Sequence, residues 1–481
     1  MPPTENSPTA PSASQEVLVA GYLSSGNGLG ETGRAVARAF GEAGLKVREY
    51  VISQDHAHRL EGQEDAALPG HDHCPLVACM NADNLPRLIR QLGIEETSRR
   101  RVIGVWFWET ESPPAYADKA YPLVDEIWTA SEFTRGAFLR NSPVPVRVFH
   151  HPVDVTALES AVVPDAYTWP GKFVYSFTFD YHSGFDRKNP QAVCAAFRTA
   201  FPEPGLALPC GRVPMLVIKS VGGNKFRIES EELVRAGGGR PDILFLDAFV
   251  SSADRDGLAR RADAVVSLHR SEGLGLTLLE AMALGKPCIA TGYSGNLAFM
   301  NEENSFLVRY HLKAVGPGSI HYPVDDFWAE PDTADAAELI LKVAREPEHA
   351  MAVGSRAREQ VRARHTHAAV GLELARSLAE LSASPTRVKD YSSLISTHAR
   401  AGKVLSDLEA GIKQRRAQSK SSRNGSPNSG TIEDVYSEML ELVKAQRLIR
   451  QSIKEKEDQL NQRIAYLEKI IQSLVKQQQD G

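Results

Sequence analysis

The chain has 481 residues, of which 42% are hydrophobic and 24% are charged; this composition excludes disordered, collagen-like and disulfide-scaffold proteins. The formal net charge of −5 disfavours nucleic acid as a partner, because nucleic-acid binding needs a basic surface. The five cysteines form no CxxC pair, which suits a reducing compartment. No apolar run reaches the roughly 20 residues of a membrane span. We therefore expect a cytoplasmic protein without a transmembrane segment, and peripheral association with the inner face of the membrane stays open.

Residues 1–15 differ in composition from the rest of the chain. They are rich in Pro and Ser and have neither the basic start nor the apolar run of a secretory signal. We expect a disordered tail here.

Residues 16–160 alternate between short apolar runs and helical stretches. Strands that alternate with helices predict a parallel sheet covered on both faces. The expected strands of this N-terminal domain cover residues 17–22, 46–53, 75–80, 101–108, 125–130 and 146–151.

A second set of alternating elements comes after a hinge near residues 155–170 and forms a domain over residues 165–383. A long helical stretch after residue 332 closes it. Both domains are thus of the α/β class. Ligands of parallel sheets bind beyond the carboxyl ends of the strands, so we expect the functional site in the cleft between the domains. The expected strands of the second domain cover residues 172–179, 215–220, 242–249, 264–269 and 287–291.

The last hundred residues or so have a different character. Residues 384–430 are rich in Ser, Lys and Arg and predict a linker. In residues 431–479 apolar side chains recur every three or four positions, and no Gly or Pro interrupts them, which predicts a C-terminal coiled-coil helix. Because such a helix needs a partner for its apolar stripe, we expect self-association through it. A helix folded back on the globular body is the alternative.

The segment 269–287, HRSEGLGLTLLEAMALGKP, is the strongest chemical signal. It comes directly after an expected strand, passes through a turn containing Gly273 and Gly275, and opens a helix at Leu276. A helix N-terminus attracts phosphate through its free N–H groups and dipole. Glu272 and Glu280 are eight residues apart, so both carboxylates can project to one side of a helix. An ordinary strand–helix turn with solvated acids would have the same spacing.

Residues 272–275, Glu280 and the Gly-Lys-Pro turn at 285–287 resemble the glutamate-x7-glutamate signature of family four glycosyltransferases. The resemblance covers roughly residues 16–380. It implies the GT-B fold, in which two Rossmann-like domains face a cleft, and a retaining transfer from a sugar nucleotide without a metal or other cofactor. It also implies that Glu272 faces the transferred sugar as a catalytic residue and that Glu280 binds the ribose.

A basic pair, Arg187 and Lys188, opens a helix just after the first expected strand of the second domain. Two cations beside a helix start can clamp a diphosphate. In the family a basic pair grips the pyrophosphate here, and the usual glycine-arginine after the strand is replaced by Phe177-Thr178. Which of Arg187 and Lys188 reaches the phosphate stays open.

The first expected strand is succeeded by a glycine-rich run, residues 26–33, that imitates a dinucleotide-binding fingerprint. This pattern alone is weak, and no ribose-binding acid stands after the second strand. In the resembling family this loop faces the cleft near the diphosphate and acceptor, so we assign Gly28 and Gly30 to the substrate site rather than to NAD.

Two further strand ends of the N-terminal domain carry candidate residues. Trp106 and Trp108 have strand spacing, which predicts that they share a face, and an aromatic face can stack on a sugar. Trp108-Glu109 takes the place of the family's histidine-glutamate pair, so we expect substrate contact from Trp108 and a catalytic role for Glu109. Core packing and helix capping are the alternatives. Asn81 is a weaker candidate of the same kind.

In the second domain, the resemblance places the turn 291–296 beside the sugar and phosphate, which makes Ser294, Gly295 and Asn296 donor-binding candidates. Lys219 ends a strand and is expected to reach the nucleotide, and residues 247–249 are expected to pass the base.

Two patterns could suggest a metal. Asp254-Arg255-Asp256 sits at a helix start, where acids act as caps. The His-rich segment 56–74 lacks the spacing of a zinc site. We expect no bound metal.

These patterns together predict a hexosyltransferase that uses GDP-mannose or a UDP-sugar and acts on a glycan acceptor, with surface polysaccharide synthesis as its role. A GT-B epimerase or phosphorylase, and a coiled-coil scaffold subunit with an inactive cleft, are the alternatives.

Overall fold

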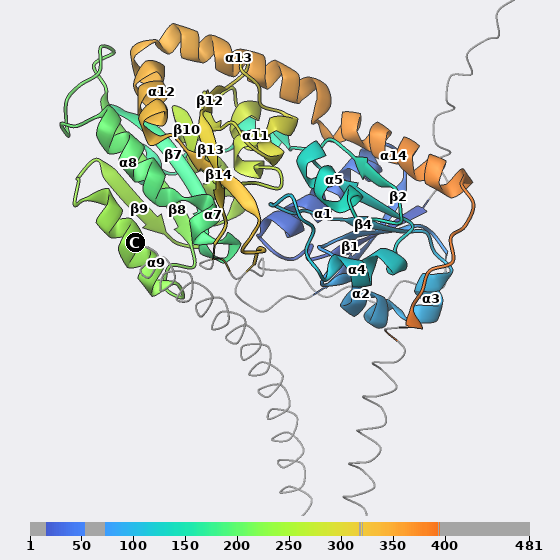
Figure 1. Cartoon of the computed structure of the whole chain (residues 1–481). Coiled ribbons are helices and arrows are strands. Elements are labelled where there is room, and N and C mark those ends of the chain that lie inside the picture. The colour runs from blue at the N-terminus through green and yellow to red at the C-terminus, as the bar shows by residue number, and fades with distance from the viewer. Residues whose placement is uncertain (1–15, 53–72, 317–318, 320, 393, 395–481) are drawn as a thin grey trace, which may run out of the picture. The chain divides into compact units, whose positions relative to one another are not determined.

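The structure is a computed structural model that describes residues 16–52, 73–316, 319, 321–392 and 394. Within residues 16–391, apart from 316–320, the chain forms one compact unit, in which each of two parallel sheets is flanked by helices (Figure 1). The expected tail 1–15, most of the His-rich segment and the expected coiled coil 431–479 lie outside the described residues.

The first sheet has the strand order β2-β1-β3-β4-β5-β6, and all its pairs are parallel. Its strands are β1 (Glu16–Gly21), β2 (Lys46–Val51), β3 (Leu76–Cys79), β4 (Val102–Val105), β5 (Glu126–Thr129) and β6 (Val146–Val148). Its helices are α1 (Gly28–Glu42), α2 (Leu85–Leu92), α3 (Ile94–Ser98), α4 (Ala117–Ala120), α5 (Glu132–Leu139) and α6 (Val155–Ser160).

The second sheet has the order β12-β11-β10-β7-β8-β9 and is also parallel throughout. Its strands are β7 (Lys172–Asp180), β8 (Val213–Val221), β9 (Ile243–Asp247), β10 (Ala264–Ser267), β11 (Cys288–Thr291) and β12 (Phe306–Val308). An antiparallel pair, β13 (Tyr310–Ala314) and β14 (Phe327–Pro331), comes after it. The helices of this half are α7 (Phe185–Lys188), α8 (Pro190–Ala200), α9 (Arg227–Gly237), α10 (Ser252–Arg261), α11 (Leu276–Ala283), α12 (Thr333–Arg345) and α13 (Pro347–Arg364); α14 (His367–Ala383) ends the described helical part.

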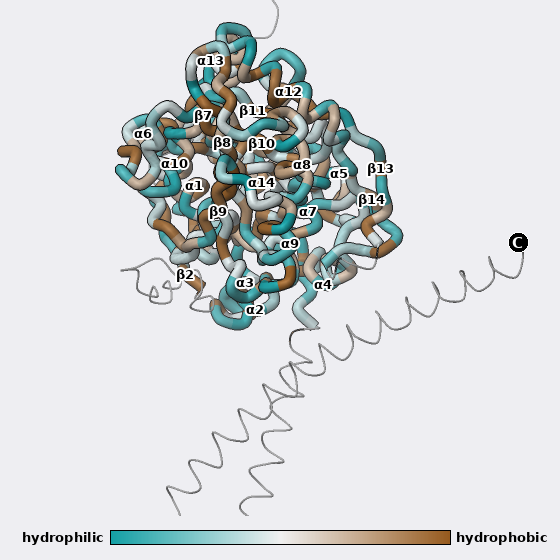
Figure 2. Tube along the Cα trace, turned by 90° about the vertical axis from the view of Figure 1, so that its left-hand side faces the viewer, coloured by the Kyte–Doolittle hydropathy of each residue, from teal (hydrophilic) through white to brown (hydrophobic). Residues whose placement is uncertain are grey.

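Every strand that the sequence predicts is present. Strands β3, β4, β5, β10 and β11 are buried at every residue, as expected when helices cover both faces of a parallel sheet. Hydrophobic stretches accordingly run along the interior strands, and hydrophilic stretches lie on the outer turns of the helices (Figure 2). The α/β prediction with two parallel-sheet domains is confirmed.

Three strands and one helix boundary differ from the prediction. Strand β12 has only three residues, too few for a periodic signal. Strand β13 is exposed at every residue and pairs only with β14, so this hairpin has no buried run at its start. The helical stretch after residue 332 is two helices, because Pro347 interrupts it. Proline has no N–H to donate, so it is tolerated at the first position of a helix such as α13 but not in the interior of a continuous one.

Helix α14 returns to the first domain, although its place in the sequence groups it with the second. It shares a hydrophobic core with α1, and a Cβ atom at Gly371 would lie 2.1 Å from the carbonyl oxygen of Ala39. His150 and Glu373 add a 2.9 Å contact between the first domain and α14. In Figure 1 this orange helix runs along the blue domain. The second domain as a spatial unit thus ends before α14.

The first residues of the expected linker pack on the first domain rather than leave it. Lys389 is buried and donates to the Asp125 carboxylate at 3.0 Å and to the Arg100 carbonyl at 2.9 Å. Arg101 donates to the carbonyl of Pro385 at 3.0 Å. Residues 384–391 therefore extend the compact unit, and only later residues can act as a linker.

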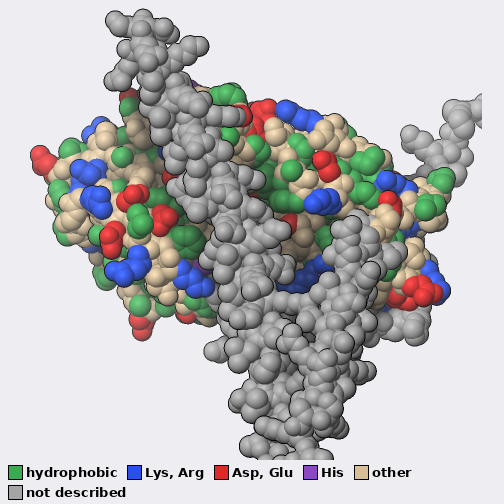
Figure 3. Space-filling model, turned by 60° about the horizontal axis from the view of Figure 1, so that its bottom comes forward, with side chains coloured by type: hydrophobic (Ala, Val, Ile, Leu, Met, Phe, Trp, Pro, Cys, Tyr) green, Lys and Arg blue, Asp and Glu red, His purple; other side chains and the backbone are tan. Residues whose placement is uncertain are grey.

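The surface of the compact unit carries both signs of charge. On the face seen in Figure 3, basic and acidic side chains are intermixed wherever described residues are visible. Within the described part of the chain, no helix combines the length and the hydropathy needed to span a bilayer.

The close approach of α14 to α1 gives a test of this packing. Replacing Gly371 by alanine forces a methyl group against the Ala39 carbonyl and should lower the free energy of unfolding by about 1–3 kcal/mol. Gly41→Ala on α1 is the control: a Cβ there meets nothing within 4 Å, and the change should stabilise by about 0.4–1 kcal/mol. Thermal unfolding of both variants measures the effect. Equal unfolding temperatures would contradict this account of α14.

Candidate functional site

The candidate site lies at the carboxyl ends of the strands, where the strand order of each sheet reverses. These switch points fall between β1 and β3 and between β7 and β10, and such points form crevices in open parallel sheets. Two cavities of about 500 and 430 Å³ lie there. Both are lined by residues of each domain, and they share Asn27, Gly28, Asp180, Ser183, Lys188 and Leu276. The expected interdomain cleft is thus present.

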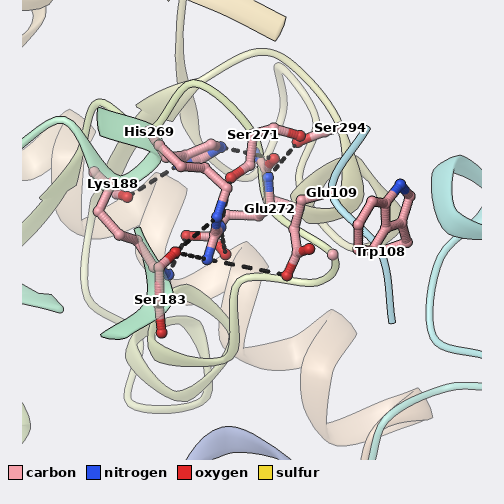
Figure 4. A network of polar contacts seen from close by, with 12 residues as sticks. Trp108, Glu109, Ser183, Lys188, His269, Ser271, Glu272 and Ser294 are labelled. Atoms are coloured by element: carbon pink, nitrogen blue, oxygen red, sulfur yellow. Dashed lines mark hydrogen bonds and ion pairs between the residues drawn. The ribbon is translucent and has the colours of Figure 1, made fainter. Parts of the chain in front are cut away.

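Glu272 is the centre of the site. It stands after β10, and its carboxylate contacts both residues of the basic pair, Arg187 Nη1 at 3.0 Å and Lys188 Nζ at 2.5 Å. Figure 4 shows Glu272 and Lys188 within this network of polar contacts. Burial by itself would raise the pKa of Glu272, but the ammonium of Lys188 and the guanidinium of Arg187 outweigh it and lower the pKa to about 2. The carboxylate is therefore ionised at neutral pH.

The two cations of the pair have different surroundings. Arg187 Nη1 also donates to the carbonyl of Ser271 at 2.7 Å, while its Nε and Nη2 donate to the carbonyl of Ser183 at 3.1 and 2.8 Å. Lys188 lines both cavities, whereas Arg187 lines only the smaller one. The structure brings both predicted residues to the site but leaves Lys188 more accessible.

The turn after β11 holds the backbone of the Glu272 loop through hydrogen bonds. Ser294 Oγ accepts from the Glu272 amide at 2.8 Å, and the Gly295 amide donates to the Glu272 carbonyl at 2.9 Å. A Cβ atom at Gly295 would lie 2.2 Å from the Gly273 carbonyl oxygen. The side-chain amide oxygen of Asn296 lies 3.0 Å from Nε2 of the buried His269 ring. Ser294, Gly295 and Asn296 line neither cavity, so these expected ligand-binding residues hold the loop instead.

The other domain grips the same loop. The Gly273 carbonyl accepts from Ser131 Oγ at 2.8 Å and from Thr134 Oγ1 at 3.3 Å, and Gly273 lines the smaller cavity. Ser131 is also the N-cap of α5. In the sequence Ser131 has only the pattern of a capping residue, so nothing there indicates this contact.

Helix α11 carries the second glutamate into the larger cavity. Gly275, with φ of 93°, makes the turn into the helix, and Leu276 begins it; Leu276 and Glu280 both line that cavity. Burial raises the pKa of Glu280 to about 7, although Arg255 lies 3.8 Å away and opposes the rise. Glu280 is therefore a carboxyl group poised to donate or accept near neutral pH.

Arg255 is a residue of the site that sequence reasoning missed. It comes from the Asp-Arg-Asp motif, which does start a helix: Ser251 caps α10, and Asp254 belongs to its first turn. Arg255 contacts Glu280 on one side and Glu31 of α1, at 3.5 Å, on the other. In the sequence the two acids of this motif suggest a metal site or helix caps, whereas in the structure its arginine links the two domains.

The glycine-rich run of the first domain is mostly helix. Asn27 caps α1 by accepting from the Gly30 amide at 2.9 Å, and Gly28 lines both cavities. A Cβ atom at Gly30 would lie 2.3 Å from the Ser25 carbonyl oxygen, so Gly30 is needed for packing against the preceding turn. Gly28 therefore borders the cavities, and Gly30 supports the turn that precedes it.

Glu109 joins the cluster from the first domain. Its Oε2 accepts from the hydroxyl of Tyr322 at 3.0 Å, and its Oε1 lies 4.0 Å from Arg187 Nη2. Glu109 and Asn81 both line the smaller cavity, and the Asn81 side-chain oxygen accepts from the Phe107 amide at 2.9 Å. Tyr322 lies in the connection between β13 and β14, which the sequence did not predict, so no signal pointed to it.

The two tryptophans do not share a face. Strand β4 ends at Val105, so strand alternation does not apply to Trp106 and Trp108. Trp106 is fully buried against Tyr121 and Phe138. Trp108 lines the smaller cavity and makes edge contacts with Tyr116 and Tyr322, so it forms part of the cavity wall, and its contact with a substrate stays a prediction.

The metal-binding patterns fall partly within the structure. Among the described residues, no group of three or more His, Cys, Asp or Glu side chains is arranged to hold an ion. His56, His58 and His71 of the His-rich segment lie outside the described residues.

Comparison with known proteins supports the fold and the enzyme class. Residues 212–314, which include Glu272 and Glu280, match the family model described as "Glycosyl transferases group 1", and this match supports a glycosyltransferase. No curated protein matches the chain.

Solved structures resemble the chain over most of its length. The Anabaena protein HepE in complex with UDP and glucose is 12% identical, with a TM-score of 0.53 over 76% of this chain and 100% of that chain. A sucrose-phosphate synthase from Thermosynechococcus elongatus is 16% identical, with a TM-score of 0.53 over 77% and 100%. A glycosyltransferase from Rickettsia africae is 14% identical, with a TM-score of 0.55 over 77% and 100%. The expected GT-B fold is confirmed.

The raised pKa of Glu280 predicts a pH-dependent stability. In the unfolded chain a glutamate ionises near its ordinary pKa of 4.5, whereas the folded chain keeps Glu280 protonated up to about 7. Stability is therefore lost as pH rises through this window. Replacing Glu280 by glutamine removes the titration, so between about pH 5 and about pH 8 the variant should gain roughly 1–3 kcal/mol relative to wild type.

The measurement is the unfolding temperature of the ligand-free chain as a function of pH. Glu348→Gln on α13 is the matched control, because its side chain is exposed and its difference from wild type should not vary with pH. A difference between Glu280→Gln and wild type that stays flat across the window would show that Glu280 is ionised in the folded chain.

Proposed function

We propose that this protein is a retaining glycosyltransferase that moves a hexose from a sugar nucleotide to a hydroxyl group of a glycan, without a metal. One observation carries the proposal: the ionised Glu272, paired with Arg187 and Lys188, stands in the loop that leads into α11, and Glu280 on α11 lines the adjoining cavity. This arrangement lies between two parallel-sheet domains of the GT-B fold.

The site suits a nucleoside diphosphate. The N-terminus of α11 and that of α1 both border the larger cavity at Leu276 and Gly28, and helix N-termini favour phosphate groups. Lys188 adds a cation on the same wall. Glu280, whose carboxyl group is deeper along α11, can accept and donate hydrogen bonds to the two hydroxyls of a ribose. The diphosphate would then lie between the ribose and the Glu272 loop.

The smaller cavity suits the sugar and its acceptor. It places Glu272, Glu109 and the Tyr322 hydroxyl around one space. In the proposed reaction the bond between the sugar and the diphosphate breaks, and the acceptor hydroxyl attacks the same face of the sugar, which retains its configuration. The proton of that hydroxyl leaves to a phosphate oxygen of the donor. Lys188 and the helix N-termini stabilise the charge that develops on the leaving diphosphate.

The substrates are proposed by class. GDP-mannose and UDP-sugars are the candidate donors, and a structural neighbour, Anabaena HepE, is described in complex with UDP-glucose. A growing surface polysaccharide or a lipid-linked glycan is the candidate acceptor. We place the reaction in the cytoplasm, with peripheral membrane association, and we assign self-association to residues 431–479.

A binding screen followed by a transfer assay tests the donor assignment. Thermal unfolding is measured with UDP, GDP, UDP-glucose and GDP-mannose, and binding should raise the unfolding temperature, because a ligand at 100 times its Kd adds about 2.7 kcal/mol. The donor found is then incubated with glycan acceptors, and NMR of the product gives the anomeric configuration. An inverted product would overturn the retaining assignment, and failure of all four ligands to bind would overturn the proposal.

Two variants test the charged cluster. Glu272→Gln and Lys188→Met each remove one charge from the site and should lower kcat about 100- to 1,000-fold. Glu272→Gln leaves the cations of Arg187 and Lys188 without their carboxylate, so it should also lower the unfolding temperature, and rates are compared at temperatures where both variants are folded. Glu348→Gln and Lys342→Met, exposed on α13 and α12, are the matched controls and should keep wild-type rates. Wild-type rates in the cluster variants would place the chemistry elsewhere.

The same assays separate the alternatives. An epimerase or phosphorylase would convert the donor without any glycan acceptor. A scaffold subunit would bind no donor, and loss of the coiled-coil segment, rather than Glu280→Ala, would abolish glycan synthesis in cells. A transferase requires both donor and acceptor.

A further inference from the structure

Lys219 is a buried cation on the wall of the larger cavity. It lies near the end of β8, beside Thr178 of β7 and Leu246 of β9 in the sheet register. The residue is only 7% exposed, yet it lines the cavity together with Lys188 and Glu280. A lysine at this depth is unfavourable in its charged form unless an anion or acceptor is near.

No acceptor is close to its ammonium group. Within the part of the chain that the structure describes, Lys219 Nζ has no hydrogen bond and no carboxylate within ion-pair distance. The charged groups that face it are Asp180 at the end of β7, Asp247 at the end of β9, and Arg255 on α10. Asp180 accepts from His182, and Asp247 accepts from Ser220 Oγ, each at 2.9 Å. Burial lowers the pKa of Lys219 to about 8.

Arg187, by contrast, makes four hydrogen bonds within the protein. Its guanidinium donates to the Ser183 and Ser271 carbonyls and to Glu272, and it does not line the larger cavity. A guanidinium with this set of partners fixes the position of the Glu272 loop. Because Arg187 lines only the smaller cavity, its guanidinium is not placed to bind an anion in the larger one.

We infer that Lys219, with Lys188, forms the cation pair that binds the diphosphate of the nucleotide, and that Arg187 positions Glu272. This inference rests on the proposed function and assigns the phosphate-binding residues of its donor site. Thr178 of β7 carries no charge, but it is the register partner of Lys219 on the neighbouring strand β8. The Lys219 ammonium therefore supplies the positive charge at this point of the sheet. Lys188 approaches the same cavity from the end of α7.

Binding of UDP and of GDP, compared with uridine and guanosine, tests the assignment by isothermal titration calorimetry on the full chain. Lys219→Met should raise the Kd of the better-bound diphosphate about 10- to 100-fold, as for loss of a hydrogen bond between charged groups, and leave the Kd of its nucleoside unchanged. Lys286→Met is the matched control: Lys286 is also partly buried, but it donates to the Arg260 carbonyl and lies outside both cavities.

The pH dependence separates a phosphate contact from a structural role. With a pKa of about 8, Lys219 loses its proton, and with it its positive charge, as the pH rises through about 8. Wild-type affinity for the diphosphate should therefore fall over the same pH range. Lys219→Arg keeps its charge and should bind with a smaller pH dependence. Lys188, whose pKa burial also lowers, is present in both proteins, so the difference between them reports Lys219. The arginine variant also provides the test if Lys219→Met does not fold.

The outcomes are distinguishable. If the wild-type chain binds neither UDP nor GDP, the proposed function fails, and this inference fails with it. If wild type binds but Lys219→Met binds equally well, or if Lys219→Arg keeps the wild-type pH dependence, then Lys219 does not contact the diphosphate, while the proposed function survives.

Discussion

The ion pairs of Glu272 are the interaction on which the site depends. A buried carboxylate is stable only when its charge is compensated, and here two cations from the end of α7 compensate it. That requirement brings the loop after β10 against α7, which comes after β7. Because β7 and β10 are neighbours at the switch point of the second sheet, the charge cluster forms where the sheet opens a crevice.

The same loop depends on the other domain. Ser131 and Thr134, at the start of α5, hold the Gly273 carbonyl, Arg255 reaches Glu31 of α1, and the Asp326 carboxylate accepts from the Ser112 amide at 2.9 Å. These contacts cross from one domain to the other, and Arg255 and Glu31 also line the larger cavity. A change in the relative position of the domains would therefore alter the loop that carries Glu272, so domain movement and the electrostatics of the site are coupled in this fold.

The sequence predicted those features that local patterns along the chain determine. Alternating apolar runs predicted both parallel sheets, and the glycine turn before α11 predicted the helix start beside Glu272. It was uninformative where a role is created by tertiary contact. Tyr322 comes after an exposed strand without a periodic pattern, and Arg255 is indistinguishable in sequence from a helix-start residue. Ser294 and Asn296 look like ligand-binding polar groups, but their hydrogen bonds are made to Glu272 and His269.

The contrast between supporting and ligand-binding groups gives a physical way to sort the polar residues of the cleft. A buried polar group must have its hydrogen bonds satisfied, either by the protein or by a ligand. Arg187, Ser294 and Asn296 are satisfied by the protein and so act as supports. Lys219 faces a cavity with an unsatisfied ammonium, and Glu280 faces it as a carboxyl group whose pKa burial raises to about 7. A ligand with phosphates and hydroxyls would supply partners for both of these groups.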